Sequence, residues 1–272
     1  MNLTTIIGLI AAFGVMVYGI MGSGELLNFY DVPSIFITII GAFAILVAST
    51  PARVLSDIPK HLKVIFAGKK QNAMAFIDTI VDFAQIARRS GLLALEEKAN
   101  QETDEFLKSS ILQIVDGVDA GKVRAVLEAN IDNIMARHEE AAGFYDKGAA
   151  LGPAFGMIGT LIGLINMLKG LDVEAEGAAA MLGKNMSVAL VTTFYGSVLA
   201  NAIFMPLSNQ LKSKSEEEYL CKVIVMEGVL AIQAGENPKY IREKLESLLS
   251  QKTREKAAKK GGTPAASDSP SE

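Results

Sequence analysis

Acidic and basic side chains are absent from the four long apolar stretches of this sequence. The stretches without Asp, Glu, Lys, Arg or His are residues 3–21, 33–52, 148–168 and 185–211. General acid–base catalysis and metal binding both need such groups, so we predict no catalytic residue, metal site or cofactor there. An ion that crosses a membrane is normally carried by an ionisable side chain, which here would have to come from another protein.

The polar side chains that do occur in the last two stretches are hydroxyls and amides. They belong to Thr160, Asn166, Thr192, Thr193, Ser197 and Asn201. One interpretation is that they hydrogen-bond neighbouring helices to one another, which is common in membrane bundles. The other is that some of them line a path for ions. The residue types alone leave both interpretations open.

Glycine recurs at helical spacing in the third stretch. The glycines that follow a four-residue interval are Gly148, Gly152 and Gly156, and then Gly159 and Gly163. Residues four apart share one face of a helix, so this face has no side chains and lets another backbone approach closely. Pro153 lies in the same stretch, removes one amide donor and predicts a kink. We therefore expect this helix to pack tightly around a neighbour.

Length and composition favour a membrane protein with a sizeable polar part. Half of the 272 residues are hydrophobic, and the mean hydropathy is +0.31. Each apolar stretch is long enough to cross a bilayer core of about 30 Å as a helix. The net charge of −4 argues against nucleic-acid binding, and the single cysteine excludes an internal disulfide. Because no segment alternates with a period of two, we predict an all-α, polytopic membrane protein with four transmembrane helices and a helical cytoplasmic domain.

The polar segments divide the chain into five parts. We predict a transmembrane hairpin at 1–52, a cytoplasmic helical domain at 53–147, two further spans with a short external loop at 148–211, cytoplasmic C-terminal helices at 212–251 and a disordered tail at 252–272. Lys and Arg number 13 in residues 53–147 and 11 after Leu211, whereas the two short connections hold only Lys184. The positive-inside rule therefore puts both termini in the cytoplasm. The external loop carries Asp172, Glu174 and Glu176, which we expect to keep it in water.

Local signals set the helices of the polar part. An apolar face at helical spacing predicts an amphipathic helix over 71–90 that Gly91 stops. A second helix is expected to end at Gly117. Asp119 is suited to cap a third, which we expect to run straight into the span at Gly148.

The order of these parts and four local sequences resemble the MotA-type proteins, the ring subunits of the bacterial flagellar stator. LGPAFGMIGTLIGL at 151–164 and VALVTTFYGSVLANAIFMPLSNQL at 188–211 resemble the third and fourth spans of that family. RRSGLLALEE at 88–97 resembles its rotor-facing charged segment, and AGENP at 234–238 is also similar. The resemblance extends from the start of the chain to about residue 251.

The resemblance implies roles for particular residues. Arg88 and Glu96 match the family's rotor-facing charges, and Pro153 and Pro206 match its pore-helix prolines. Thr160 and Thr193 match positions on its ion pathway, whereas Asn201 replaces an aromatic residue found in some members. The glycine face, with Gly152, Gly156, Gly159 and Gly163, suits packing around a partner helix.

The resemblance also implies partners and a function. Five subunits are expected to ring a dimer of a MotB-like single-span protein, whose aspartate carries the ion, in the lipid of the bacterial inner membrane. Inward ion flow, with protons favoured and sodium possible, would then be coupled to torque on the rotor protein FliG. Two alternatives stay open. An ExbB/TolQ-like energiser of outer-membrane processes is one, although the N-terminal hairpin favours the MotA type; a self-contained channel or scaffold is the other.

Overall fold

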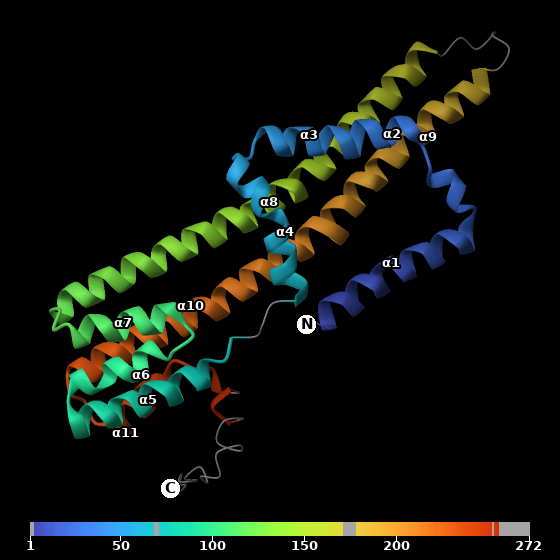
Figure 1. Cartoon of the computed structure of the whole chain (residues 1–272). Helices are drawn as coiled ribbons and strands as arrows, with labels where there is room; N and C mark the ends of the chain where they lie inside the picture. The colour runs from blue at the N-terminus through green and yellow to red at the C-terminus, as the bar shows by residue number, and fades with distance from the viewer. Residues whose placement is uncertain (1–2, 68–70, 171–177, 252, 256–272) are drawn as a thin grey trace, which may run out of the picture. The chain divides into compact units, whose positions relative to one another are not determined.

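The computed structural model describes residues 3–67, 71–170, 178–251 and 253–255, and every regular element in this part of the chain is helical (Figure 1). The α-helices are α1 (Leu3–Ser23), α2 (Val32–Ser34), α3 (Gly41–Ala48), α4 (Ala52–Ala67), α5 (Ala73–Ser90), α6 (Glu96–Asn100), α7 (Glu105–Val115), α8 (Ala120–Lys169), α9 (Ala178–Val198), α10 (Met205–Gln233) and α11 (Pro238–Ser247). Between them lie 3₁₀ turns at Leu26–Phe29 and Leu92–Leu95 and π-helical segments at Ile35–Ile40 and Leu199–Phe204.

These helices form two compact units. The first unit comprises the described residues within 1–69 and 137–214, and the second those within 70–136 and 215–272. Long helices contribute to both, since α8 and α10 each contain residues of the two units. The predicted acidic residues Asp172, Glu174 and Glu176 lie outside the described residues, as does the predicted tail at 252–272 apart from 253–255.

The predicted all-helical, polytopic membrane fold is confirmed by the apolar helices of the described chain. Three are long and apolar enough to cross a membrane, and they lie in Thr5–Ser23, Ala120–Lys169 and Ala178–Gln233.

The second predicted span, 33–52, was expected to be one helix, but the structure breaks it. Val32–Ala48 and Ala52–Phe66 pass the same criterion only together, and the chain bends by 118° between them.

The early end of that helix has a local cause. The hydroxyls of Ser49 and Thr50 donate to the carbonyl oxygen of Leu46, at 3.2 and 2.6 Å, and so compete with the backbone ladder. Pro51 follows and has no amide hydrogen to continue it. The apolar helix therefore ends at Ala48, and α4 starts in a new direction.

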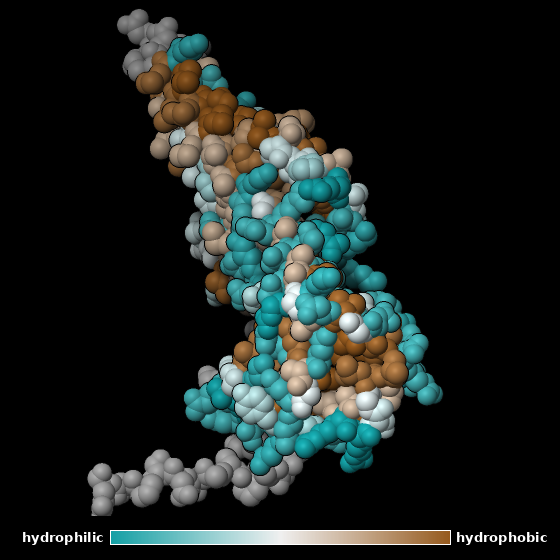
Figure 2. All heavy atoms as spheres, turned by 90° about the vertical axis from the view of Figure 1, so that its left-hand side faces the viewer, coloured by the Kyte–Doolittle hydropathy of each residue, from teal (hydrophilic) through white to brown (hydrophobic). Residues whose placement is uncertain are grey.

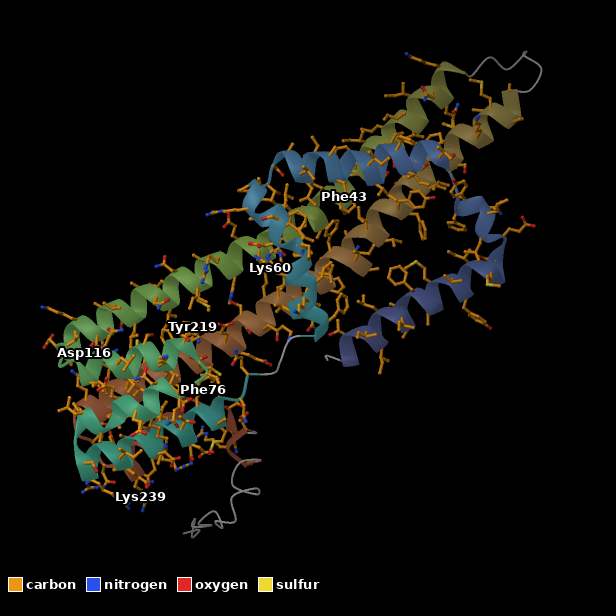
Figure 3. The ribbon with its side chains drawn as sticks, in the orientation of Figure 1. Phe43, Lys60, Phe76, Asp116, Tyr219 and Lys239 are labelled. Atoms are coloured by element: carbon orange, nitrogen blue, oxygen red, sulfur yellow. The ribbon has the colours of Figure 1, made fainter. Side chains whose placement is uncertain are left out.

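The core of the first unit joins α3, α4, α8, the π-helical segment Leu199–Phe204 and α10. Its buried residues are Ala42, Leu46, Val54, Ile65, Ala142, Phe144, Tyr145, Leu199, Phe204 and Leu211. Phe43 on α3 adds a ring contact with Phe204, with 5.7 Å between the centroids (Figure 3). Gly148 permits this packing, because a Cβ there would lie 2.6 Å from the Phe204 ring. Since α4 packs in this unit, residues 53–67 do not group with the predicted domain at 53–147.

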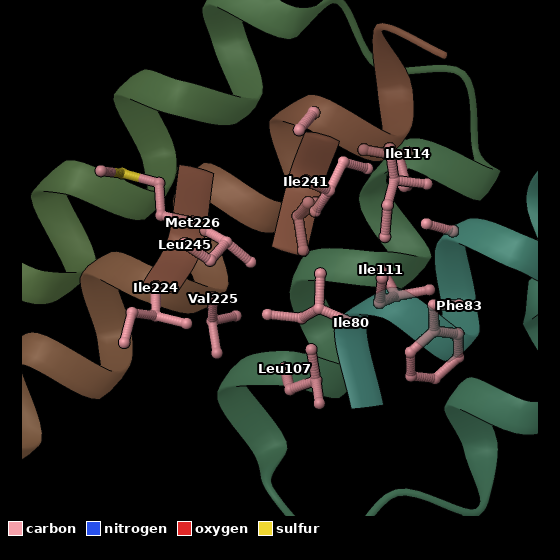
Figure 4. Packing of buried hydrophobic residues seen from close by; sticks show 14 of the residues in the cluster. Ile80, Phe83, Leu107, Ile111, Ile114, Ile224, Val225, Met226, Ile241 and Leu245 are labelled. Carbon is pink, nitrogen blue, oxygen red and sulfur yellow. The ribbon is translucent and has the colours of Figure 1, made fainter. Parts of the chain in front are cut away.

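The second unit is built around one hydrophobic core shared by α5, α6, α7, α8, α10 and α11. Ile80 and Phe83 of α5 meet Leu107 and Ile111 of α7, with Val225 of α10 close by (Figure 4). Each helix has a single apolar stripe that must be covered by others. The predicted C-terminal helices at 212–251 thus complete the fold of the preceding insert, whereas the sequence indicated two separate segments.

The local helix signals are confirmed. Gly91 and Gly117 end helices with φ of +80° and +73°, the left-handed region that glycine adopts without strain. Asp119 Oδ1 accepts a hydrogen bond from the amide of Gly121 at 3.0 Å, as expected of a cap. From there α8 runs for 50 residues through Gly148 without a break.

Candidate functional site

A pair of hydroxyls joins the two apolar helices of the first unit. Thr160 on α8 and Thr193 on α9 have their Oγ1 atoms 2.6 Å apart. Both also lie near the carbonyl oxygen of Ala189, at 3.1 and 3.2 Å, and Thr160 Oγ1 lies 3.0 Å from the carbonyl oxygen of Gly156. The structure therefore brings together the two residues that the resemblance places on an ion pathway.

The chemistry of this pair is that of a neutral hydrogen-bonding site. Each hydroxyl has one proton to donate and two lone pairs that accept, so the two hydroxyls cannot donate to all of the neighbouring carbonyl oxygens at once. Thr193 is exposed in the isolated chain and Thr160 is half-buried. Such a site can exchange hydrogen bonds with a passing ion or water, but it has no charge with which to carry an ion by itself.

The neighbouring threonine shows the other use of a hydroxyl in a membrane bundle. Thr192 is fully buried, and its Oγ1 donates back to the carbonyl of Val188 or Ala189, at 2.9 or 3.0 Å. Its own carbonyl lies 3.4 Å from the hydroxyl of Thr38, which the sequence did not single out. The hydroxyl of Thr192 therefore bonds within its own helix, and its side chain serves in packing.

The glycine face of α8 lies against α9. A Cβ at Gly152 or Gly163 would lie 2.7 Å from the carbonyl oxygen of Gly196 or Asn185, and one at Gly159 would collide with the side chain of Thr192. At Gly156 the nearest atoms, in Thr192 and Thr193, would lie at 3.2 Å. The role that the structure shows for these glycines is close contact between two helices of one chain. Their predicted packing around a partner helix stays a prediction.

The two predicted prolines differ in their surroundings. Pro153 is exposed and lies inside α8, one residue after Gly152. Pro206 is the second residue of α10, with only Met205 between it and the π-helical segment Leu199–Phe204. The hydrogen-bond ladder is already altered in a π segment, so a residue without an amide hydrogen is accommodated there.

A charged cluster lies at the end of the apolar segment of α8. Asp146 accepts from the hydroxyl of buried Ser208 at 2.6 Å and from Lys212 Nζ at 2.7 Å. Partial burial opposes ionisation of this carboxyl most, but the hydrogen bonds from Lys212 and Ser208 together lower its pKa. Asp146 is therefore a charged link between α8 and α10.

The predicted rotor-facing charges lie in the second unit. Arg88 is in the last turn of α5 and Glu96 begins α6, with the positive-φ Gly91 between them. Both side chains are exposed, and neither forms an ion pair with another described residue. Leu93, in the connecting 3₁₀ turn, is 75% exposed, which is unusual for a leucine in a packed unit. These side chains are available to a second protein.

No group of three or more His, Cys, Asp or Glu side chains among the described residues is placed to hold a metal ion. The two histidines lie in the polar part of the sequence, and burial lowers the pKa of His61, so its neutral form is favoured. The arrangement thus offers hydrogen bonding, close packing and exposed charge rather than a cluster of ligands.

Comparison with known proteins gives one consistent result. Residues 98–223 match the MotA/TolQ/ExbB proton channel family. A motility protein A of Borreliella burgdorferi is 36% identical over 255 residues, which cover 93% of this chain and 96% of the relative. The structure of C. jejuni MotAB matches with a TM-score of 0.82 at 30% identity, covering 92% of this chain and 97% of that one. The flagellar MotAB stator complex of Bacillus subtilis matches with the same score at 31% identity, covering 93% and 98%.

Proposed function

This chain belongs to the MotA/TolQ/ExbB proton channel family and is a stator subunit of the motility protein A type, and we propose that five copies of it surround a MotB-like dimer. The MotB-like helix supplies the ion-binding carboxylate that the four apolar stretches of this chain lack. That missing carboxylate is the observation that carries the proposal. Ion passage drives the ring stepwise around the dimer, and the cycle requires no covalent bond to be made or broken.

The driving force is sufficient for such steps. One elementary charge that crosses a potential of 100 mV releases about 2.3 kcal/mol. In the proposed cycle the Thr160–Thr193 pair exchanges hydrogen bonds with the ion or its water while the partner's carboxylate is loaded or emptied. Protons are the favoured ion, because the matched family is described as a proton channel family.

The surface of the first unit supports an environment of lipid and neighbouring subunits. None of the apolar window Thr5–Ser23 in α1 is buried within the chain. Figure 2 shows hydrophobic residues covering the end of the unit where α8 finishes and α9 begins. The exposed residues on these two helices include Met157, Leu161, Ile165, Leu168, Met186 and Leu190. A surface of this kind is stable in a bilayer or against another apolar helix. We place the chain in the inner membrane of a bacterium, with both termini in the cytoplasm.

Thr193→Val is expected to slow ion transfer while leaving the stator assembled. Valine keeps the shape of threonine and removes the hydroxyl that lies 2.6 Å from Thr160. Loss of one positioned hydrogen-bonding group typically costs about 0.5–1.5 kcal/mol, or roughly a two- to tenfold lower rate if the effect falls on the transition state. Swimming speed under load and ion flux of the purified complex, each with and without sodium, provide the measurement.

The matched control for this variant is Thr192→Val, which removes a buried hydroxyl that bonds only within its own helix. It is expected to lower stability without a selective loss of flux. Normal rotation of the Thr193→Val motor under load would show that Thr193 serves in packing alone.

Arg88→Glu is expected to impair swimming more than Arg88→Ala, with the complex still assembled and conducting. A surface ion pair contributes only about 0–1 kcal/mol, so neutralisation has a graded effect. Reversal adds repulsion between like charges at the rotor surface. A compensating charge reversal on FliG should restore swimming speed, whereas Lys122→Glu, the same reversal at another exposed site of the second unit, should have little effect. Loss of assembly in Arg88→Glu, or failure of every rotor reversal to rescue it, would refute charge steering.

A further inference from the structure

The contact between α4 and α8 in the first unit contains two polar atoms without partners. The rings of His61 on α4 and Tyr145 on α8 meet edge to face, with 6.2 Å between their centroids. His61 Nδ1 and the hydroxyl oxygen of Tyr145 are buried, and neither has a hydrogen-bond partner among the described residues. A buried polar atom without a partner is destabilising. These two atoms therefore weaken the contact in which they lie.

Apolar packing holds the rest of α4 in the first unit. Val54 and Ile65 of α4 are buried in the core of that unit. Arg53 forms an ion pair with Glu140 of α8 at 2.8 Å, but its side chain is 75% exposed. An ion pair so accessible to water adds little stability. Docking of α4 thus depends on apolar burial, which a charge formed inside the contact would oppose.

Protonation of His61 changes what this contact has to bury. A neutral imidazole carries one proton and can leave Nδ1 without it, whereas the imidazolium carries a proton on both nitrogens. The protonated Nδ1 would then be a buried donor without an acceptor, on a ring that also bears a charge. Burial accordingly lowers the pKa of His61 below its ordinary value. The docked helix favours the neutral ring.

The nearest charges do not reverse this preference. Asp57, one turn earlier on α4, favours the charged imidazole, but its carboxylate is already paired with Lys60 at 2.6 Å. Lys60 itself and His138 of α8 act in the opposite direction and disfavour the charged form. Burial has a larger effect on the pKa of His61 than any of these three groups.

Other ionisable groups on the neighbouring helices are neutral or have partners of their own. Burial raises the pKa of Tyr145, so its phenol stays protonated at neutral pH. On α8 the carboxylate of Glu140 is paired with Arg53, and that of Asp146 is paired with Lys212 of α10 at 2.7 Å. These groups leave the buried Nδ1 without a countercharge.

We propose that His61 makes the docking of α4 on α8 dependent on pH, so that the helix is docked while the imidazole is neutral and loosens when the imidazole takes up a proton. Because the docked state has the lower pKa, docking is fully stable above a pH of about 6.5, the pKa of a free imidazole. It loses stability as the pH falls from there to the lowered pKa of the docked state. This inference goes beyond the proposed function, because it gives the subunit a response to the pH of the compartment that bathes α4.

The test is hydrogen exchange in the purified stator complex, this chain with its MotB-like partner, between about pH 5.5 and 8, where histidine titrates. Protection factors, which already correct for the chemical effect of pH on exchange, are compared for peptides of α4 and of α7. Protection in α4 should fall by up to about tenfold for each pH unit below about 6.5, the limit for uptake of one proton. Protection in α7, which contains no histidine, should stay constant.

The two histidines of the sequence, His61 and His138, provide a matched pair of variants. His61→Gln replaces the ring by a polar side chain that does not titrate, so protection in α4 should no longer depend on pH. His138→Gln should retain the fall, with its midpoint shifted slightly to higher pH because a repulsive neighbour is removed. His61→Leu is a second variant that does not titrate, and it replaces His61→Gln if that protein has a lowered melting temperature.

Three outcomes would overturn the proposal. One is constant protection of α4 in the wild type at all pH values. Another is a fall that persists in both His61 variants or disappears in His138→Gln, since the response would then belong to another group. The third is a fall shared equally by α4 and α7, which would mean that the whole chain loosens rather than α4.

Discussion

Gly152→Ala is expected to destabilise the protein by about 1–3 kcal/mol, the usual cost of an overpacked contact. The added Cβ would lie 2.7 Å from the carbonyl oxygen of Gly196, and the obstacle is backbone that cannot rotate away. Alanine would otherwise favour the helix by about 1 kcal/mol over glycine. A loss of stability in Gly152→Ala would thus show that α8 and α9 are in close contact, whereas a gain would show that they are not. Gly156→Leu, which puts a large side chain against Thr192 and Thr193, should cause a greater loss.

The matched control is Gly143→Ala on the same helix, where a Cβ would meet nothing within 4 Å. This variant should be neutral or slightly more stable, because only the helix preference changes. The measurement is the melting temperature of the detergent-solubilised complex, followed by circular dichroism at 222 nm. Equal melting temperatures for Gly152→Ala and Gly143→Ala would contradict the packing described for α8 and α9.

The glycine face also shows what could and could not be predicted from the sequence. A four-residue interval identifies which residues share a helix face, and this followed from the sequence. It does not identify the neighbour that fills the face. The resemblance points to a helix of another protein, which stays a prediction, and within the chain the structure places Gly196 and Thr192 against this face. Contacts between residues far apart in the sequence leave no local pattern.

Helix ends were predictable where one residue type decides them. Gly91 and Gly117 adopt positive φ, and Asp119 caps α8, as expected from their chemistry. The apolar helix in the second predicted span ends at Ala48, four residues before the predicted end of that span at 52. Hydropathy treats Ser49 and Thr50 as tolerable in a span, but their hydroxyls take part in backbone hydrogen bonding.

The domain boundaries were harder to predict from the sequence, for a related reason. The residues after Arg53 were assigned to the cytoplasmic domain because they are charged and amphipathic. In the structure Val54 and Ile65 of α4 belong to the core of the first unit. An amphipathic pattern shows that a helix has an apolar face, but it does not show which core covers that face.

A second large effect, the loss of ion flux, is expected when this chain is studied without its partner. Liposomes that contain this chain alone should show ion flux at the level of protein-free liposomes, whereas the complex with its MotB-like partner conducts. None of the four apolar stretches contains an acidic or basic side chain. The polar site they provide, the Thr160–Thr193 pair, is neutral. A charge at the centre of a bilayer costs at least about 2.5–3.5 kcal/mol even with local adaptation, and two hydroxyls offset little of that cost.

The control for this experiment is the complex whose partner carries asparagine in place of its ion-binding aspartate. Because asparagine keeps the shape and removes the charge, this complex should assemble and yet conduct no better than the chain alone. Size-exclusion chromatography of both samples must show an assembled ring, so that absent flux is not caused by unfolding. Flux through the chain alone at the rate of the complex would mean that the four helices form a complete ion path. In that case the chain would be a self-contained channel, and the carboxylate of the partner would act in gating rather than in carrying the ion.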